Sequence, residues 1–142
     1  MNLLLIEDNV ADVALMEAVL EEVEIGAKIV LNVVKDGEAA LKAFTLMEEE
    51  PSSEFPDLIL LDFNLPRING LEVLKKLKKS PFLRSIPVVV FSTSSSRDDI
   101  DNCYKEYANC FITKPVDFDE FIHIIHTTVS FWSMATNKHF AA

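Results

Sequence analysis

Short apolar runs alternate five times with amphipathic segments along this chain of 142 residues, and that alternation restricts the possible folds more than any other feature. The apolar runs have the length of buried strands, whereas the segments between them carry apolar residues at helical spacing. Such alternation predicts right-handed crossovers, a parallel sheet and helices on both of its faces. We therefore expect an α/β domain with a doubly wound sheet of five parallel strands and five helices. The expected strands are 3–6, 29–34, 58–61, 88–91 and 111–112, and the expected helices are about 10–23, 37–47, 70–79, 97–107 and 117–135.

The composition indicates one domain over residues 1–142, with an extended last helix and a short C-terminal tail at about 130–142. Hydrophobic residues make up 49% of the chain and there are only 3 glycines, which argues against disorder. No apolar run approaches the ~20 residues of a membrane-spanning helix, and the run at 3–6 is too short for a signal peptide, so we expect a cytoplasmic protein with no membrane partner. The net charge of −10 would repel a phosphate backbone, so no nucleic-acid partner is expected. Cys103 and Cys110 lack metal-ligand spacing and are expected to be free thiols.

Polar residues follow four of the expected strands. Glu7 and Asp8 follow the first, Asp62 the third, Ser92 the fourth and Lys114 the fifth. Because the carboxyl ends of parallel strands share one edge of the sheet, these side chains should converge. Crowded carboxylates need a divalent cation to stay ionised together, and Mg²⁺ suits a site with few carboxylates and several waters. A fixed ammonium and a hydroxyl beside them would hold a transferring phosphoryl group, with Asp62 as the nucleophile that forms an acyl phosphate.

Each of these residues also has a simpler interpretation. A lone aspartate after an apolar strand often just begins a loop, and an acidic pair before a helix often serves the helix dipole. Joint placement at the ends of four separate strands favours a functional site.

The segments LLIEDN, PDLILLDFNLPRINGLEVL, IPVVVFSTS and CFITKP together resemble the receiver domain of two-component response regulators, over about residues 3–129. The resemblance implies a flavodoxin-like fold of receiver type. It implies that Asp62 is the phosphoacceptor, and that Glu7, Asp8, Asp62 and the backbone carbonyl of Asn64 hold Mg²⁺. A sensor histidine kinase would be the phosphodonor, and the protein would be no enzyme beyond catalysing its own phosphorylation and dephosphorylation.

The same resemblance assigns three further residues. Ser92 would be the switch hydroxyl, Lys114 the lysine that pairs with the phosphate, and Phe111 the switch aromatic, which would swing inward when Ser92 moves. The Lys114–Pro115 peptide would be cis. Thr93 departs from the small residue usual after the switch hydroxyl and could narrow access for the phosphodonor.

More closely, the loop at 48–56, the segment VVVFSTS and the pair Phe131-Trp132 are similar to stand-alone response regulators that partner bacterial phytochromes. Other functions stay open: an aspartate-nucleophile phosphatase, a phosphorelay intermediate that passes phosphate to a histidine phosphotransfer protein, or a receiver that only binds partners. Phosphatases of that kind usually carry a second aspartate two residues after the nucleophile. Asn64 occupies that position and cannot act as a carboxylic acid, which favours the signalling switch.

Two expectations concern helix faces. In the fourth helix, Ile100, Cys103, Tyr104 and Tyr107 should be buried. The last helix has a broader apolar surface than one sheet face can cover, which predicts a homodimer through this helix, the fifth strand and the fourth helix. Its sheet-facing arc would be Phe118, Phe121, Ile122, Ile125, Val129 and Trp132, and its second stripe would be Ile124, Thr128, Phe131 and Ala135. Alternatively, the tail could fold back over Phe131 and Phe140.

Overall fold

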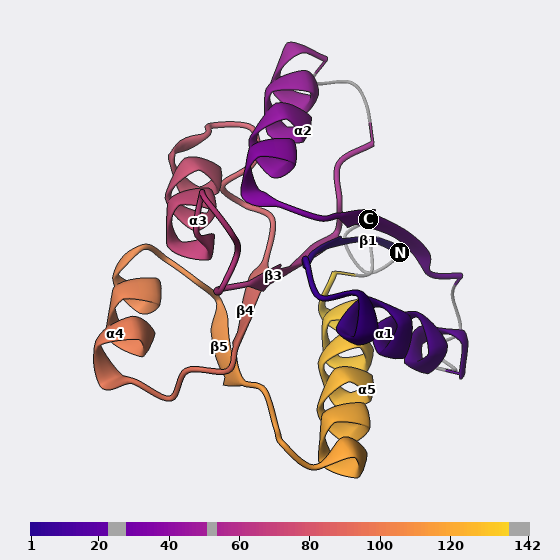
Figure 1. Ribbon diagram of the computed structural model, residues 1–142. Coiled ribbons are helices and arrows are strands. Elements are labelled where there is room, and N and C mark those ends of the chain that lie inside the picture. The colour runs from indigo at the N-terminus through magenta and orange to yellow at the C-terminus, as the bar shows by residue number, and fades with distance from the viewer. Residues whose placement is uncertain (23–27, 51–53, 137–142) are drawn as a thin grey trace.

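The computed structural model describes residues 1–22, 28–50 and 54–136 and contains five strands and five helices in strict alternation (Figure 1). The strands are parallel and lie in the order β2-β1-β3-β4-β5, so the predicted doubly wound α/β fold is confirmed. The elements are β1 (Asn2–Ile6), α1 (Val10–Glu22), β2 (Val30–Val34), α2 (Gly37–Glu49), β3 (Leu58–Asp62), α3 (Gly70–Lys79), β4 (Val88–Ser92), α4 (Arg97–Lys105), β5 (Cys110–Thr113) and α5 (Phe118–Ala135).

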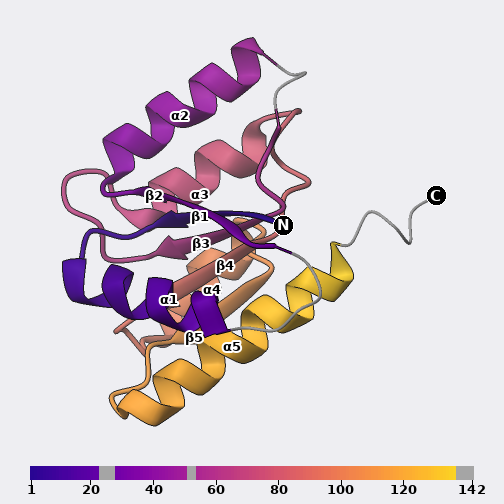
Figure 2. The ribbon, with the colours of Figure 1, turned by 90° about the vertical axis from the view of Figure 1, so that its right-hand side faces the viewer.

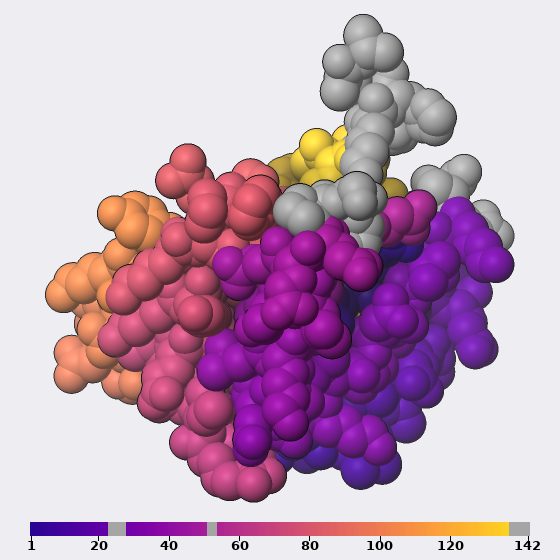
Figure 3. Space-filling model, turned by 90° about the horizontal axis from the view of Figure 1, so that it is seen from above, coloured from indigo at the N-terminus to yellow at the C-terminus, as the bar shows by residue number. Residues whose placement is uncertain are grey.

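Helices cover both faces of the sheet, with α2, α3 and α4 on one side and α1 and α5 on the other (Figures 1 and 2). Figure 3 shows α2 and α3 side by side on the first face, with α4 beyond them. Alternate residues of β1 point to opposite faces of the sheet. Leu4 and Ile6 pack toward α2 and α3, whereas Leu3 and Leu5 pack toward α1 and α5. All residues of β3 and β4 are buried, because both strands lie inside the sheet and are covered on both faces.

Side-chain caps fix the starts of the helices and therefore the loops that precede them. Asn9, Asp36, Asn69 and Ser96 each accept a hydrogen bond from the backbone N–H three residues later. Asp117 accepts one from the N–H of Asp119. The loops that lead from strand ends into α1, α2, α3, α4 and α5 are thereby held against the sheet edge.

The fourth helix departs from the expectation. It ends at Lys105, and Tyr107 has a φ of 70° that turns the chain out of the helix. Cys103 is buried, but Tyr104 and Tyr107 are 46% and 73% exposed, so the prediction that they would be buried is wrong. For Tyr107 the periodicity assumed that the helix continued through residue 107. Tyr104 lies within the helix, but its hydroxyl accepts a hydrogen bond from the N–H of Phe111 and the side chain stays partly exposed.

The last helix differs at its first residue. Phe118 is 61% exposed and does not cover the sheet, which corrects the expected inner arc at its N-terminal end. Phe121, Ile125 and Val129 are buried as expected, and Thr128 of the second stripe is buried too. Val23, part of the loop at 48–56 and the tail from residue 137 lie outside the described residues, so the extent of the single domain stays a prediction.

Candidate functional site

The ends of β1 and β3 bring three carboxylates together. The two strands are neighbours, with Ile6 paired to Leu61, so the residues that follow these positions lie side by side. Each of Glu7, Asp8 and Asp62 offers a carboxylate oxygen, and these oxygens lie within 4.8 Å of one another. The Glu7 side chain is 1% exposed and Asp62 is 4% exposed, whereas Asp8 is exposed.

Burial and mutual repulsion perturb these acids. The pKa of Glu7 is raised from 4.5 to about 7, mainly by burial. The neighbouring Asp62 contributes to the rise, and Lys114 opposes it. The pKa of Asp8 is also raised, by partial burial and by its contact with Asp62. Glu7 Oε1 accepts a hydrogen bond from the N–H of Asn9 at 3.1 Å. The cluster therefore holds negative charge at an energetic cost that a bound cation would relieve.

Lys114, at the end of β5, is the cation that approaches this cluster. Its ammonium lies 2.9 Å from Glu7 Oε2, 3.0 Å from Asp12 Oδ2 and 3.6 Å from Asp62 Oδ1. Burial alone would lower the pKa of Lys114, but its hydrogen bonds and ion pairs with these carboxylates raise it overall. The Lys114–Pro115 peptide is trans, so the cis bond implied by the family resemblance is corrected.

Asp12 was missed by the sequence analysis. It lies in the first turn of α1, where an acidic residue is common because it interacts favourably with the helix dipole. The sequence offered no signal for its role, because Asp8 precedes the helix and a spacing of four residues therefore does not place the two side chains on one helix face.

The hydroxyl of Ser92, the expected switch residue at the end of β4, is hydrogen-bonded to the side chain of Asn64. Ser92 is fully buried, and its Oγ donates to Asn64 Oδ1 at 3.0 Å and accepts from the N–H of Ser94 at 3.0 Å. Thr93 Oγ1 donates to the same Asn64 oxygen at 3.4 Å. Sequence analysis assigned Asn64 only a backbone role, whereas its side chain joins the loop after β3 to the end of β4.

The expected switch aromatic, Phe111, lies half-buried in β5, on the sheet face covered by α2, α3 and α4. Its ring meets Phe63 edge to face, with 6.3 Å between ring centroids. Its backbone N–H donates to the hydroxyl of Tyr104 at 3.0 Å, which ties α4 to β5. Phe111 is therefore linked to both the loop after β3 and the fourth helix.

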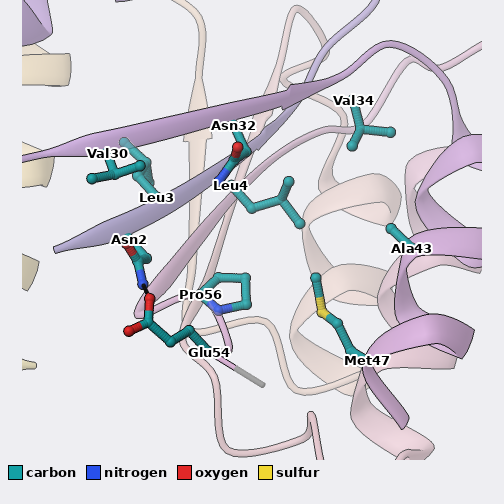
Figure 4. Close-up of a pocket in the computed structure, with 10 residues that line it drawn as sticks. All are labelled: Asn2, Leu3, Leu4, Val30, Asn32, Val34, Ala43, Met47, Glu54 and Pro56. Atoms are coloured by element: carbon teal, nitrogen blue, oxygen red, sulfur yellow. Dashed lines mark hydrogen bonds between the residues drawn. The ribbon is translucent and has the colours of Figure 1, made fainter. Parts of the chain in front are cut away.

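A separate hollow of about 310 Å³ lies between β1, β2 and α2 (Figure 4). Its wall is mainly apolar, and Asn2 Nδ2 donates to Glu54 Oε2 across one end at 3.3 Å. It contains none of the residues predicted for the site. Among the described residues, those predicted for the site lie instead at the strand ends, where they provide three carboxylates, one ammonium and a buried hydroxyl.

Comparison with known proteins agrees with this geometry. The sequence model of the family described as the response regulator receiver domain matches residues 3–126. Response regulator Rcp1 of Synechocystis sp. is 38% identical over 130 residues, covering 92% of this chain and 87% of that protein. The probable methanogenesis regulatory protein FilR2 of Methanothrix harundinacea is 35% identical, covering 92% of this chain and 82% of that protein.

Several solved structures of response regulators have a similar fold, including two at 38% identity. The Mn²⁺-bound form of Rcp1 superposes with a TM-score of 0.83, at 38% identity and with coverage of 92% of this chain and 93% of that one. The phosphorylated cyanobacterial phytochrome response regulator RcpA has a TM-score of 0.83, at 38% identity and with coverage of 94% of both chains. Together with the carboxylate cluster, the metal-bound relative indicates a divalent metal site. No helix in the described part of the chain is both long and apolar enough to cross a membrane.

Proposed function

This chain belongs to the receiver-domain family of response regulators, and from that membership we propose that Asp62 accepts a phosphoryl group from a sensor histidine kinase. One observation carries the choice of residue. Asp62 ends the central strand β3, between the acids of β1 and the Ser92 hydroxyl of β4, with the Lys114 ammonium 3.6 Å away. A phosphoryl group on Asp62 would therefore meet cationic and hydroxyl donors from two other strands.

In the proposed reaction a carboxylate oxygen of Asp62 attacks the phosphorus of a phosphohistidine. The new O–P bond forms as the P–N bond breaks, and the leaving imidazole nitrogen keeps the bonding electron pair. Lys114 and Ser92 then donate hydrogen bonds to the phosphoryl oxygens. The protein's only catalysis in this proposal is of its own phosphorylation and dephosphorylation.

The proposed metal is Mg²⁺, held by Glu7, Asp8, Asp62 and the backbone carbonyl of Asn64. The convergence of three carboxylate oxygens supports this, because oxygen ligands in a small set suit a hard cation that keeps several waters. When bound, the ion would neutralise charge on the carboxylates and on the phosphoryl oxygens.

Signalling would follow from movement of Ser92. Its hydroxyl bonds Asn64 in the described state, and donation to a phosphoryl group would break that bond and free space beside Phe111. Phe111 would then turn inward. Since its backbone is tied to Tyr104, the change would extend to α4.

The kinase partner proposed is a bacterial phytochrome. Support comes from the similarity to RcpA, which is described as a phytochrome response regulator, at 38% identity. The bacteriophytochrome response regulator AtBRR is also similar, at 36% identity and a TM-score of 0.66. A cytoplasmic location and the lack of a nucleic-acid partner stay predictions from the sequence.

Homodimerisation through α5, β5 and α4 is a further part of the proposal. Phe131 and Met134 are 56% and 69% exposed on α5, and a groove of about 460 Å³ lined in part by Ile112 and Ile124 lies between β5 and α5. A two-fold axis would place each exposed stripe against its mate. Sedimentation of the wild type and of the double variant Ile124→Glu, Phe131→Glu tests this, and a wild type that is monomeric at high micromolar concentration with and without beryllofluoride would exclude the dimer.

The phosphoacceptor is tested by labelling with acetyl phosphate in Mg²⁺. Wild type should gain one phosphoryl group by intact-mass spectrometry, and Asp62→Asn should gain none, because its amide is a poor nucleophile. Asp57→Asn, which changes an acid just before the same strand, serves as the control and should label normally. Equal labelling of Asp62→Asn and wild type would refute the assignment.

A further inference from the structure

The Lys114 ammonium lies closer to two other carboxylates than to the proposed phosphoacceptor. It is 2.9 Å from Glu7 and 3.0 Å from Asp12, but 3.6 Å from Asp62. Glu7 belongs to the carboxylate cluster that suits a metal ion, whereas Asp12 is not among those converging acids. Asp12 has no role in the phosphoryl chemistry proposed above.

Lys114 does not need Asp12 to keep its position. Its side chain is only 9% exposed, and the nearly fully buried Glu7 carboxylate already holds the ammonium. Its backbone N–H donates to the Ser92 carbonyl at 2.6 Å, which fixes the main chain of this residue to β4. The loss of Asp12 would therefore remove one of several restraints on Lys114.

The charge of Asp12 has a larger effect than its anchoring. A phosphoryl oxygen that accepts a hydrogen bond from Lys114 would lie within about 6 Å of Asp12 Oδ2, since the two contacts share the ammonium. At that separation, repulsion between the two negative charges should weaken the binding of the anion about tenfold. This figure allows for screening by solvent, because the Asp12 side chain is 26% exposed. A metal ion held by the other three carboxylates would leave this charge in place.

We propose that Asp12 weakens the hold of Lys114 on the phosphoryl group and thereby sets the affinity of the site for phosphoryl-like anions. The inference rests on the proposed function. Asp12 acts here by its charge, because it shares the Lys114 ammonium with the phosphoryl group. Its removal should strengthen anion binding, which is the opposite of what damage to the site would do.

The test uses the full chain and beryllofluoride, measured by calorimetry in saturating Mg²⁺. Asp12→Asn removes the charge and keeps a side-chain oxygen at the same position, and Asp12→Ala removes both. Glu21→Gln is the matched control, because it removes the same charge from an exposed position on the same helix, about 13 Å further along the axis. Urea unfolding of each variant checks that it folds, and Mg²⁺ affinity is measured in parallel.

Asp12→Asn and Asp12→Ala should each bind beryllofluoride about tenfold more tightly than wild type, and Glu21→Gln should stay within twofold. Mg²⁺ affinity should fall, because a negative charge near the metal has been removed. Opposite shifts for the anion and the cation identify a charge effect, whereas misfolding would weaken both. Unchanged or weaker anion binding in Asp12→Asn would overturn the inference, and a wild type that binds no beryllofluoride would instead refute the proposed function.

Discussion

Gly70 leaves room for the backbone that carries Asp62, and replacing it with alanine should displace this backbone and thereby disturb the site. A Cβ atom at position 70 would lie 2.5 Å from the carbonyl oxygen of Asp62 and 2.6 Å from the Cα atom of Phe63. Both contacts are with main chain, which cannot rotate away as a side chain can. The Gly70 N–H also donates to the Phe63 carbonyl at 3.0 Å, and this hydrogen bond holds the start of α3 close to the end of β3.

The cost of Gly70→Ala comes from overpacking. A methyl group forced into a well-packed core typically destabilises by about 1–3 kcal/mol. Alanine regains at most about 1 kcal/mol of helix propensity, and less at the first residue of α3. Since β3 is paired on both sides, the strain should be relieved by displacing the end of this strand. A shift of about 1 Å in Asp62 is enough to lower beryllofluoride affinity about tenfold or more.

Gly37→Ala is the matched control, because it also places a Cβ against backbone at the start of a helix. There the contact is with the carbonyl oxygen of Ile68, which lies in the loop between β3 and α3, six residues beyond Asp62, rather than with the backbone of Asp62 itself. Both variants should lower the urea midpoint by about 1 M, but only Gly70→Ala should weaken beryllofluoride binding. The reasoning is refuted if Gly70→Ala is as stable as wild type, or if both variants bind the anion equally well.

Two further predictions concern pH and the fourth helix. Burial raises the pKa of Glu7 from 4.5 to about 7, so the metal-free folded protein binds this proton more tightly than the unfolded chain does. The protonated carboxyl therefore stabilises the folded protein below pH 4.5, and this stabilisation is lost as the pH rises through 7. Mg²⁺ must displace the same proton, so the apparent affinity for Mg²⁺ should fall about tenfold per pH unit below 7. Equal Mg²⁺ affinities at pH 6 and pH 8, measured by calorimetry, would contradict this. Tyr104→Phe should lower the free energy of unfolding by about 1 kcal/mol, because the N–H of Phe111 on the outer edge of β5 loses its acceptor, and an unchanged urea midpoint would show that water replaces it.

The fold could be predicted because the periodicity of the sequence reports burial directly. Leu58–Leu61 reads as an uninterrupted apolar run since β3 is covered on both faces, and all four residues are buried. Boundaries were less accurate where the flanking residues do not distinguish strand or helix from turn. Cys110 and Thr113 extend β5 beyond the predicted pair, and the fourth helix ends two residues early at Lys105.

The site was predictable to the extent that topology alone assembles it. Parallel strands place their carboxyl ends together, so Glu7, Asp8 and Asp62 could be grouped without any coordinates. Asp12 could not, because its contact with Lys114 depends on how α1 leaves β1 and on the reach of a long side chain from β5. The side-chain role of Asn64 was hidden for a similar reason, since its carboxamide crosses from one strand end to the next.

The Ser92–Asn64 hydrogen bond limits how strongly phosphorylation can drive the proposed switch. Ser92 would exchange a neutral hydrogen bond to Asn64 Oδ1 for one to a charged phosphoryl oxygen, and charge-assisted bonds are about twice as strong as neutral ones. With a neutral bond worth about 1 kcal/mol, the net gain is about 1 kcal/mol, or a five- to tenfold change in the conformational equilibrium. Thr93 also donates to Asn64, so part of the cost of releasing the asparagine is avoided when Ser92 leaves. A gain of this size shifts a population rather than driving it to completion, since a change from 1:99 to 99:1 needs about 5.5 kcal/mol. Any larger response must therefore come from contacts made only in the active state, and a second copy or a partner packed on α4, β5 and α5 is where such contacts could form.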